Sequence, residues 1–135
     1  MKAVTLLFGL IISLASIAQD TVKTASGLQI ITLQKGDGEK PQVGQEVKVK
    51  YLGFLENEEV FDESPGFKYV LGDKTIIPGW NEALQQMRLH EKAIIILPPH
   101  LAYGEKGSRD EYEPDKYSIP PNSTILFEMT LLKIK

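Results

Sequence analysis

The segment that most constrains the fold of this chain is Ile76-Ile77-Pro78-Gly79-Trp80. Two β-branched residues, which favour extended backbone, precede a Pro-Gly pair, which fixes a bend. The bend leads into the one clear helix, expected from about Gly79 to Arg88. On it Trp80, Leu84 and Met87 lie at the spacings i, i+4 and i+7. This spacing gives the helix a single apolar stripe, which we expect to pack against a sheet.

The rest of the chain shows mainly the patterns of β-strands. Val47, Val49 and Tyr51 alternate with charged residues, a period of two that is typical of a strand with one buried face. Similar patterns predict strands at residues 28–33, 47–51, 60–61, 67–71, 93–97 and 123–134, and a long polar loop at 104–118. The expected fold is therefore α+β, a twisted antiparallel β-sheet wrapped around one short α-helix.

Composition excludes several classes of function. The chain has 15 Lys and Arg residues against 18 Asp and Glu, a net charge of −3, and it lacks the basic face that nucleic-acid binding requires. It has no cysteine, which rules out disulfides, thiolate metal sites and a cysteine nucleophile. His90 and His100 lack the partner spacing of a metal site. We therefore expect no cofactor.

The N-terminal segment belongs to a different class from the rest. Lys2 supplies a positive start, residues 3–15 are nearly all apolar, and Ser16-Ile17-Ala18 places small residues where a signal peptidase reads them. We expect residues 1–18 to be a signal peptide, 19–27 a linker and 28–135 the folded domain. The alternative is a retained membrane anchor, although the uncharged run of 16 residues is shorter than the roughly 17–25 that a spanning helix needs.

Several separated motifs occur in the order found in the FKBP-type peptidyl-prolyl isomerases, and the chain resembles that family from Leu28 to Lys135. The motifs are Val49-Lys50-Tyr51-Leu52-Gly53, Phe61-Asp62, Phe67 to Gly72, Ile76 to Trp80, Ala102-Tyr103-Gly104, Ile119-Pro120-Pro121 and Leu126-Phe127. The resemblance implies an FKBP-like fold and an enzyme that rotates Xaa-Pro peptide bonds without a cofactor. Its implied partners are proline-containing polypeptides, with macrolides such as rapamycin as further candidate ligands. A monomer in a bacterial periplasm is expected, or a membrane-tethered form if the signal is retained.

The resemblance also implies a proline pocket, with Trp80 as its floor and Tyr103 overhanging its rim. The implied catalytic residues are Asp62 and Tyr103. The implied substrate-binding residues are Tyr51, Phe61, Phe67, Ile76, Ile77, Trp80, Ile119 and Phe127. In the family pattern the Tyr51 hydroxyl partners Asp62, which lies near the substrate carbonyl, and the Ile77 backbone N–H donates to a substrate carbonyl.

These residue types suit the reaction. Rotation about a peptide bond has a barrier of ~18–20 kcal/mol, because resonance gives the C–N bond double-bond character. Twisting the bond removes the resonance and leaves the carbonyl less dipolar. An apolar pocket therefore favours the twisted state through desolvation and positioning, and it needs no nucleophile, acid or base.

Two departures from the family pattern leave questions open. The loop 104–118 is longer than in a minimal family domain and heavily charged, so the substrate preference stays open. The strand 93–97 is apolar on both faces, so we expect its second face to meet either the N-terminal segment or a partner. The main alternative function is a chaperone or adaptor that holds proline segments with little turnover. The presence of Asp62, Tyr103 and Phe127 favours the enzyme.

Overall fold

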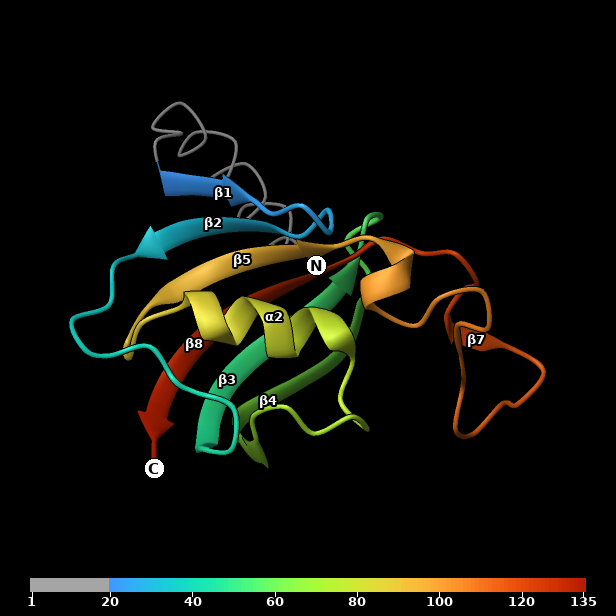
Figure 1. Ribbon diagram of the computed structural model, residues 1–135. Coiled ribbons are helices and arrows are strands. Elements are labelled where there is room, and N and C mark those ends of the chain that lie inside the picture. Colours follow the sequence, from blue (N-terminus) through green and yellow to red (C-terminus); the bar gives the residue numbers. More distant parts are fainter. Residues whose placement is uncertain (1–19) are drawn as a thin grey trace.

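The computed structural model describes residues 20–135 as an antiparallel sheet that curves around one α-helix (Figure 1). Six strands form the sheet in the order β1-β2-β5-β8-β3-β4. Their bounds are β1 Thr21–Lys23, β2 Gln29–Gln34, β3 Glu46–Leu55, β4 Val60–Val70, β5 Lys92–Leu97 and β8 Ile125–Ile134. The other elements are helix α2 Pro78–Gln86, the 3-10 turn η2 Pro99–Leu101, and a ribbon of β6 Ser108–Arg109 and β7 Tyr117–Ile119. The predicted fold class is confirmed.

Helix α2 packs with the predicted stripe toward the sheet. Trp80, Leu84 and Met87 are 5%, 0% and 0% exposed. Pro78 stands at the first helical position, where its missing N–H costs no hydrogen bond. A Cβ atom on Gly79 would collide with the side chain of Leu97, so only glycine allows this close approach of helix and β5. The helix ends at Gln86, two residues before the expected Arg88.

The alternation in β8 builds the core beneath the helix, as predicted. Ile125, Phe127, Met129 and Leu131 are all at most 2% exposed. Phe127 lies opposite Gly53 of β3, and a Cβ on Gly53 would come within 2.7 Å of the Phe127 ring and 2.8 Å of the Phe61 ring. Gly53 therefore leaves the space in which these two rings meet.

Residues 60–61 and 67–71, predicted as two strands, belong to one long strand. The segment Ser64-Pro65-Gly66 between them has the composition of a turn, yet it continues β4. β4 is the edge strand of the sheet. Proline is tolerated there because its missing N–H does not interrupt the pairing of the sheet. Two register shifts in the pairing with β3 bend the strand along its length.

The linker predicted at residues 19–27 is wrong for its middle part, because residues 21–23 form β1 and pair with β2. All three residues of β1 are exposed, so the strand carries no apolar alternation that a sequence pattern could reveal. Residues 1–19 are outside the described part of the chain, and the signal peptide stays a prediction. Within residues 20–135 no helix is long and apolar enough to cross a membrane.

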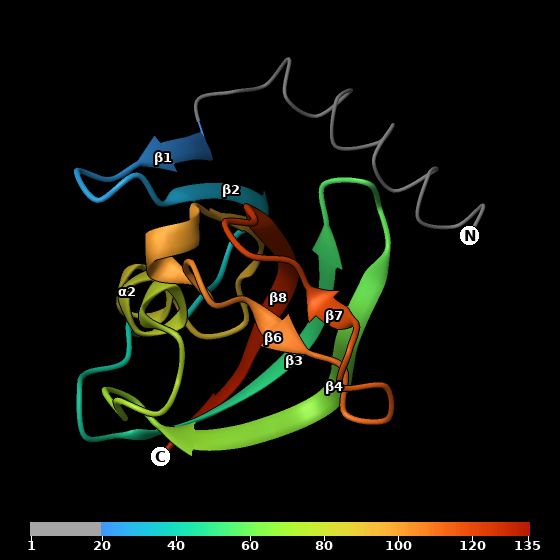
Figure 2. The ribbon, with the colours of Figure 1, turned by 90° about the vertical axis from the view of Figure 1, so that its right-hand side faces the viewer.

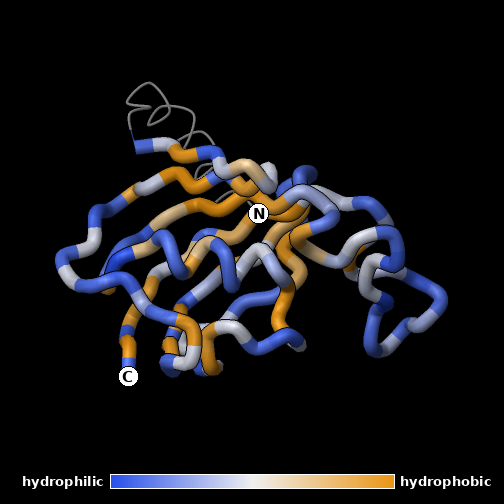
Figure 3. The backbone as a smooth tube through the Cα atoms, in the orientation of Figure 1, coloured by the Kyte–Doolittle hydropathy of each residue, from blue (hydrophilic) through white to orange (hydrophobic). Residues whose placement is uncertain are grey.

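The loop 104–118 also contains structure that was not predicted. Ser108 pairs with Ile119 and Arg109 with Tyr117, which makes β6 and β7 a short ribbon. Figure 2 shows the ribbon between η2 and β4, and Figure 3 shows that the segment is largely hydrophilic. The Arg109 guanidinium lies 4.5 Å from the centre of the Tyr117 ring, a cation–π contact across the ribbon.

A second apolar cluster lies on the sheet face opposite α2. Phe54, Ile94 and Leu126 are 1%, 0% and 7% exposed. The partly buried residues packed against them are Ile31, Leu33, Leu52 and Ile96. The prediction that the strand 93–97 is apolar on both faces is confirmed. That the N-terminal segment or a partner covers this outer face stays a prediction.

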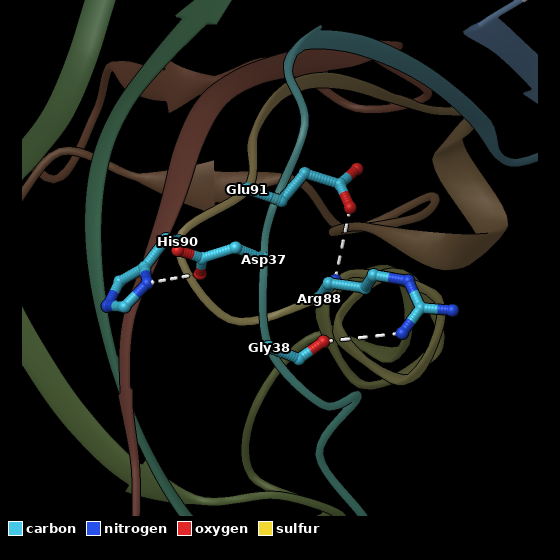
Figure 4. Close-up of polar contacts among 5 residues, drawn as sticks. All are labelled: Asp37, Gly38, Arg88, His90 and Glu91. Carbon is cyan, nitrogen blue, oxygen red and sulfur yellow. Dashed lines mark hydrogen bonds and ion pairs between the residues drawn. The ribbon is translucent and has the colours of Figure 1, made fainter.

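Polar contacts fasten the β2–β3 connection to the turn after α2 (Figure 4). Asp37 Oδ1 lies 2.6 Å from His90 Nδ1, and the Arg88 guanidinium donates to the Gly38 carbonyl at 3.3 Å. The largely buried Glu91 carboxylate accepts from the Arg88 backbone N–H at 3.1 Å and from the Thr32 hydroxyl at 3.0 Å. These contacts fix the C-terminal end of α2.

Candidate functional site

A hollow of about 240 Å³ opens where the start of α2 faces β3, β4 and β8. Its walls are Tyr51, Phe61, Asp62, Phe67, Thr75, Ile76, Ile77, Trp80, Tyr103 and Phe127. All the predicted site residues except Ile119 lie in these walls. Ile119 is buried in β7 and lines an adjoining hollow instead, because its pairing with Ser108 makes it part of the ribbon. We call the first hollow the aromatic pocket.

The aromatic pocket is built around Trp80. The ring centroids of Tyr51 and Phe127 lie 4.8 and 5.3 Å from that of Trp80, at interplanar angles of 74° and 80°. Phe61 meets Phe127 in the same way, at 5.6 Å and 83°. Each edge-to-face pair contributes about 0.5–1.5 kcal/mol beyond the area that it buries. The rings therefore hold one another in place and form a stiff apolar wall.

The Trp80 indole is held by packing alone. Its Nε1 is buried and has no hydrogen-bond partner among the described residues. A buried indole N–H usually finds an acceptor, and an unsatisfied one costs roughly 1–3 kcal/mol. The ring contacts of Trp80 therefore have to offset the cost of this unpaired donor.

Asp62 sits at the exposed rim of the pocket. The Tyr51 hydroxyl donates to its Oδ2 at 2.7 Å, and the Glu63 backbone N–H donates to its Oδ1 at 2.8 Å. Burial, followed by the hydrogen bond to Asp62 and the negative charge of that carboxylate, raises the pKa of Tyr51. The Tyr51 hydroxyl thus remains protonated at neutral pH and keeps donating to Asp62.

Tyr103 reaches the pocket from the turn after η2. The Gly104 N–H donates to the Pro99 carbonyl at 2.9 Å, and Gly104 adopts a positive φ of 61° that suits glycine. Burial and then the negative charge of Asp62 raise the pKa of Tyr103. The Tyr103 hydroxyl therefore keeps its proton at neutral pH and is a second hydrogen-bond donor beside the pocket.

Thr75 is a wall residue that the sequence reasoning missed. Its backbone N–H and its hydroxyl both donate to Asp73 Oδ1, at 2.9 and 2.8 Å. These two hydrogen bonds lower the pKa of Asp73 and fix the turn that delivers Ile76 and Ile77 to the pocket. The Asp-Lys-Thr sequence is a typical side-chain-to-backbone turn signal and could have identified this residue.

Asn81 is a positioning residue that the sequence reasoning also missed. Its Oδ1 accepts from the Tyr69 hydroxyl at 3.0 Å and from the Gly72 N–H at 2.9 Å, while its Nδ2 donates to the Asp73 carbonyl at 3.0 Å. The first turn of α2 is thereby tied to the end of β4. Among the described residues, the Ile77 backbone N–H makes no hydrogen bond, so it is free to donate to a ligand.

The chemistry of the site is that of an apolar binding pocket with a few polar groups at its rim. Within residues 20–135, Asp62 is the only charged side chain in its walls. Residues 20–135 contain no group of three His, Asp or Glu side chains that could hold a metal ion. The arrangement can seat a small apolar ring on Trp80 and offer hydrogen bonds to a neighbouring carbonyl.

Comparison with known proteins gives a family match. Residues 37–132 match the model of the FKBP-type peptidyl-prolyl cis-trans isomerases. The chain is 37% identical over 114 residues to the peptidyl-prolyl cis-trans isomerase FKBP1A of Xenopus laevis, and the match covers 81% of this chain and 99% of the frog protein.

Two bacterial proteins are also similar. The peptidyl-prolyl cis-trans isomerase Mip of Coxiella burnetii is 40% identical over 117 residues, which cover 84% of this chain and 48% of Mip. The crystal structure of FkpA from Escherichia coli superposes with a TM-score of 0.75 at 32% identity, covering 87% of this chain and 52% of FkpA. The chain thus spans about half the length of these two relatives.

Proposed function

Because the chain belongs to the FKBP-type peptidyl-prolyl cis-trans isomerases, we propose that it is a secreted member that accelerates Xaa-Pro rotation in folding proteins. Export is supported by the signal-like pattern of residues 1–18. Mip and FkpA are both bacterial proteins, and a bacterial chain that is exported enters the periplasm, which is therefore the location we propose. The alternative is a membrane-tethered protein that retains residues 1–18.

The observation that carries the mechanism is an apolar pocket with a single carboxylate at its rim. A proline ring on Trp80 places the preceding peptide bond among Tyr51, Phe61 and Phe127. There the less dipolar twisted bond loses less hydration than the planar bond does, which lowers the barrier. The free Ile77 N–H is the proposed donor to a substrate carbonyl, and the Tyr103 hydroxyl is a second one. Asp62, held by Tyr51, orients the twisted carbonyl.

The activity is tested with the chain from Gln19 onward and Leu-Pro or Phe-Pro peptides, in chelator. We expect faster cis-to-trans conversion, and faster refolding of a secreted protein whose slow step is proline isomerisation. Rapamycin should inhibit both by occupying the aromatic pocket. Binding of proline peptides without acceleration would instead favour the chaperone or adaptor, which holds proline segments with little turnover.

The location is tested on secreted material. Intact mass should give a chain that begins at Gln19, and sedimentation should give a monomer. A mass that includes residues 1–18 would contradict the secreted form and favour the membrane-tethered one.

A further inference from the structure

A second hollow, of about 430 Å³, adjoins the aromatic pocket. The two share Phe61, Asp62 and Tyr103 as a common wall. The second hollow continues over the β6–β7 ribbon, where residues 108–112 form its far side. A polypeptide bound through a proline extends beyond the pocket on both sides of that residue. One flank of the substrate can therefore reach this hollow.

The charges around the second hollow are unequal. Asp62, Asp110 and Glu111 contribute three carboxylates and Arg109 one guanidinium. The guanidinium is already engaged, because it donates to the Pro114 carbonyl at 3.2 Å and lies 4.5 Å from the centre of the Tyr117 ring. A substrate side chain thus meets mainly negative charge.

The carboxylates of Asp110 and Glu111 differ in how many hydrogen bonds they already accept. Asp110 Oδ1 accepts from the backbone N–H groups of Tyr112 and Glu113, at 2.8 and 2.9 Å, and this holds the turn of the ribbon. Glu111 is exposed and makes no hydrogen bond or ion pair with another described residue. Glu111 is therefore the carboxylate that can most readily pair with a ligand.

The second hollow also has an exposed aromatic edge. Tyr112 is 88% exposed and lines it beside Glu111. A carboxylate next to an aromatic face is suited to ammonium and guanidinium groups, which gain both an ion pair and a cation–π contact.

We propose that the second hollow is a substrate subsite that selects a lysine or arginine side chain next to the proline, with Glu111 and Tyr112 as its specificity-determining residues. The inference rests on the isomerase activity proposed above. Because the groups are exposed, the preference is modest and falls with salt.

The test compares peptides that differ only in the residue beside proline, which is Lys, Glu or Leu and is placed either before or after it. At low salt we expect kcat/KM to favour Lys over Glu by about 2–5-fold at one of the two positions, which is the scale of exposed ion pairs. Glu111→Gln should lower this ratio, Glu111→Lys should invert it, and Tyr112→Leu should reduce the preference for Arg. The Leu peptides should keep their rates in all these variants.

Glu113→Gln is the matched control. Glu113 lies in the same β6–β7 connection as Glu111, but it pairs with Lys116 at 2.8 Å and does not line the hollow, so the ratio should stay as in the wild type. A Lys-to-Glu ratio that Glu111→Lys leaves unchanged, while the Leu peptides still turn over, overturns the subsite and leaves the isomerase intact. If the wild type itself does not turn over the Leu peptides, the proposed isomerase activity is wrong.

Discussion

At the scale of single residues, the exposed position of Asp62 decides how its role is understood. A carboxylate enclosed by aromatic rings would carry a large desolvation cost, whereas Asp62 keeps contact with water and accepts from Tyr51 and from the Glu63 N–H. Its charge is therefore screened by solvent. The apolar walls, and not this charge, are expected to supply most of the catalysis.

Replacing Asp62 by Asn keeps the shape and removes the charge. We expect kcat/KM to fall by about tenfold or less, ~1.4 kcal/mol, which is the scale of one hydrogen bond to a charged group. Tyr51→Phe removes the donor of the same hydrogen bond, so the double variant should lose less than the sum of the two losses. A loss of several orders of magnitude in Asp62→Asn, with an unchanged circular dichroism spectrum, would mean that the carboxylate carries the catalysis.

Trp80 is the only tryptophan of the chain, so it reports on its own surroundings. Its emission should change when a proline peptide or a macrolide enters the pocket. Trp80→Leu should weaken binding by about tenfold or more, ~1.4 kcal/mol, because the floor loses ring area. Trp80→Phe keeps an aromatic floor and should retain more affinity. If no ligand changes the emission, Trp80 is only a core residue and does not form the floor of the pocket.

At the scale of elements, the contacts in Figure 4 show how a polar connection is held to the helix. The pKa of Asp37 is lowered, first by its hydrogen bond with His90 and then by the attraction between the two charges. The pair therefore stabilises the fold above the ordinary Asp pKa of 3.8. This contribution is lost as the pH falls through the lower pKa of the folded state.

Asp37→Asn should lower the melting temperature at pH 5, and the effect should shrink toward pH 2 as the wild-type carboxylate takes up its proton. Thermal melts at a series of pH values measure the difference. Asp115→Asn is the control, since Asp115 is exposed and makes no ion pair within residues 20–135. An equal loss at both pH values would mean that the side chain acts through packing and not through its charge.

At the scale of the whole molecule, strands could be predicted from the sequence where one face is buried and the other exposed. The buried residues of β8 and the stripe of α2 follow their periodicities closely. β1 was not predicted, because all of its residues are exposed. β4 was predicted as two strands, because Pro65 is typical of a turn and is tolerated in a strand only at the edge of a sheet. The strand order and the place of Ile119 depend on pairings between distant segments, which periodicity does not encode. The pocket was found through ordered motifs rather than through single residues.

The whole enzyme should show a flat pH profile. Tyr51 and Tyr103 both have raised pKa values, so neither loses its proton near neutral pH. We expect kcat/KM to vary by no more than about twofold between roughly pH 6 and 8.5, since no acid–base pair takes part. A bell-shaped profile would point to general acid–base catalysis and contradict the desolvation mechanism.

The openness of the aromatic pocket sets a limit on what this protein can accomplish. Both isomers of a client must enter and leave through the same mouth, past Tyr103 and Asp62. The reaction breaks no covalent bond and consumes no energy source, so the pocket raises the rates of the cis-to-trans and trans-to-cis reactions by the same factor. The client's own folding then decides which isomer accumulates, because only the native structure withdraws one of them from exchange.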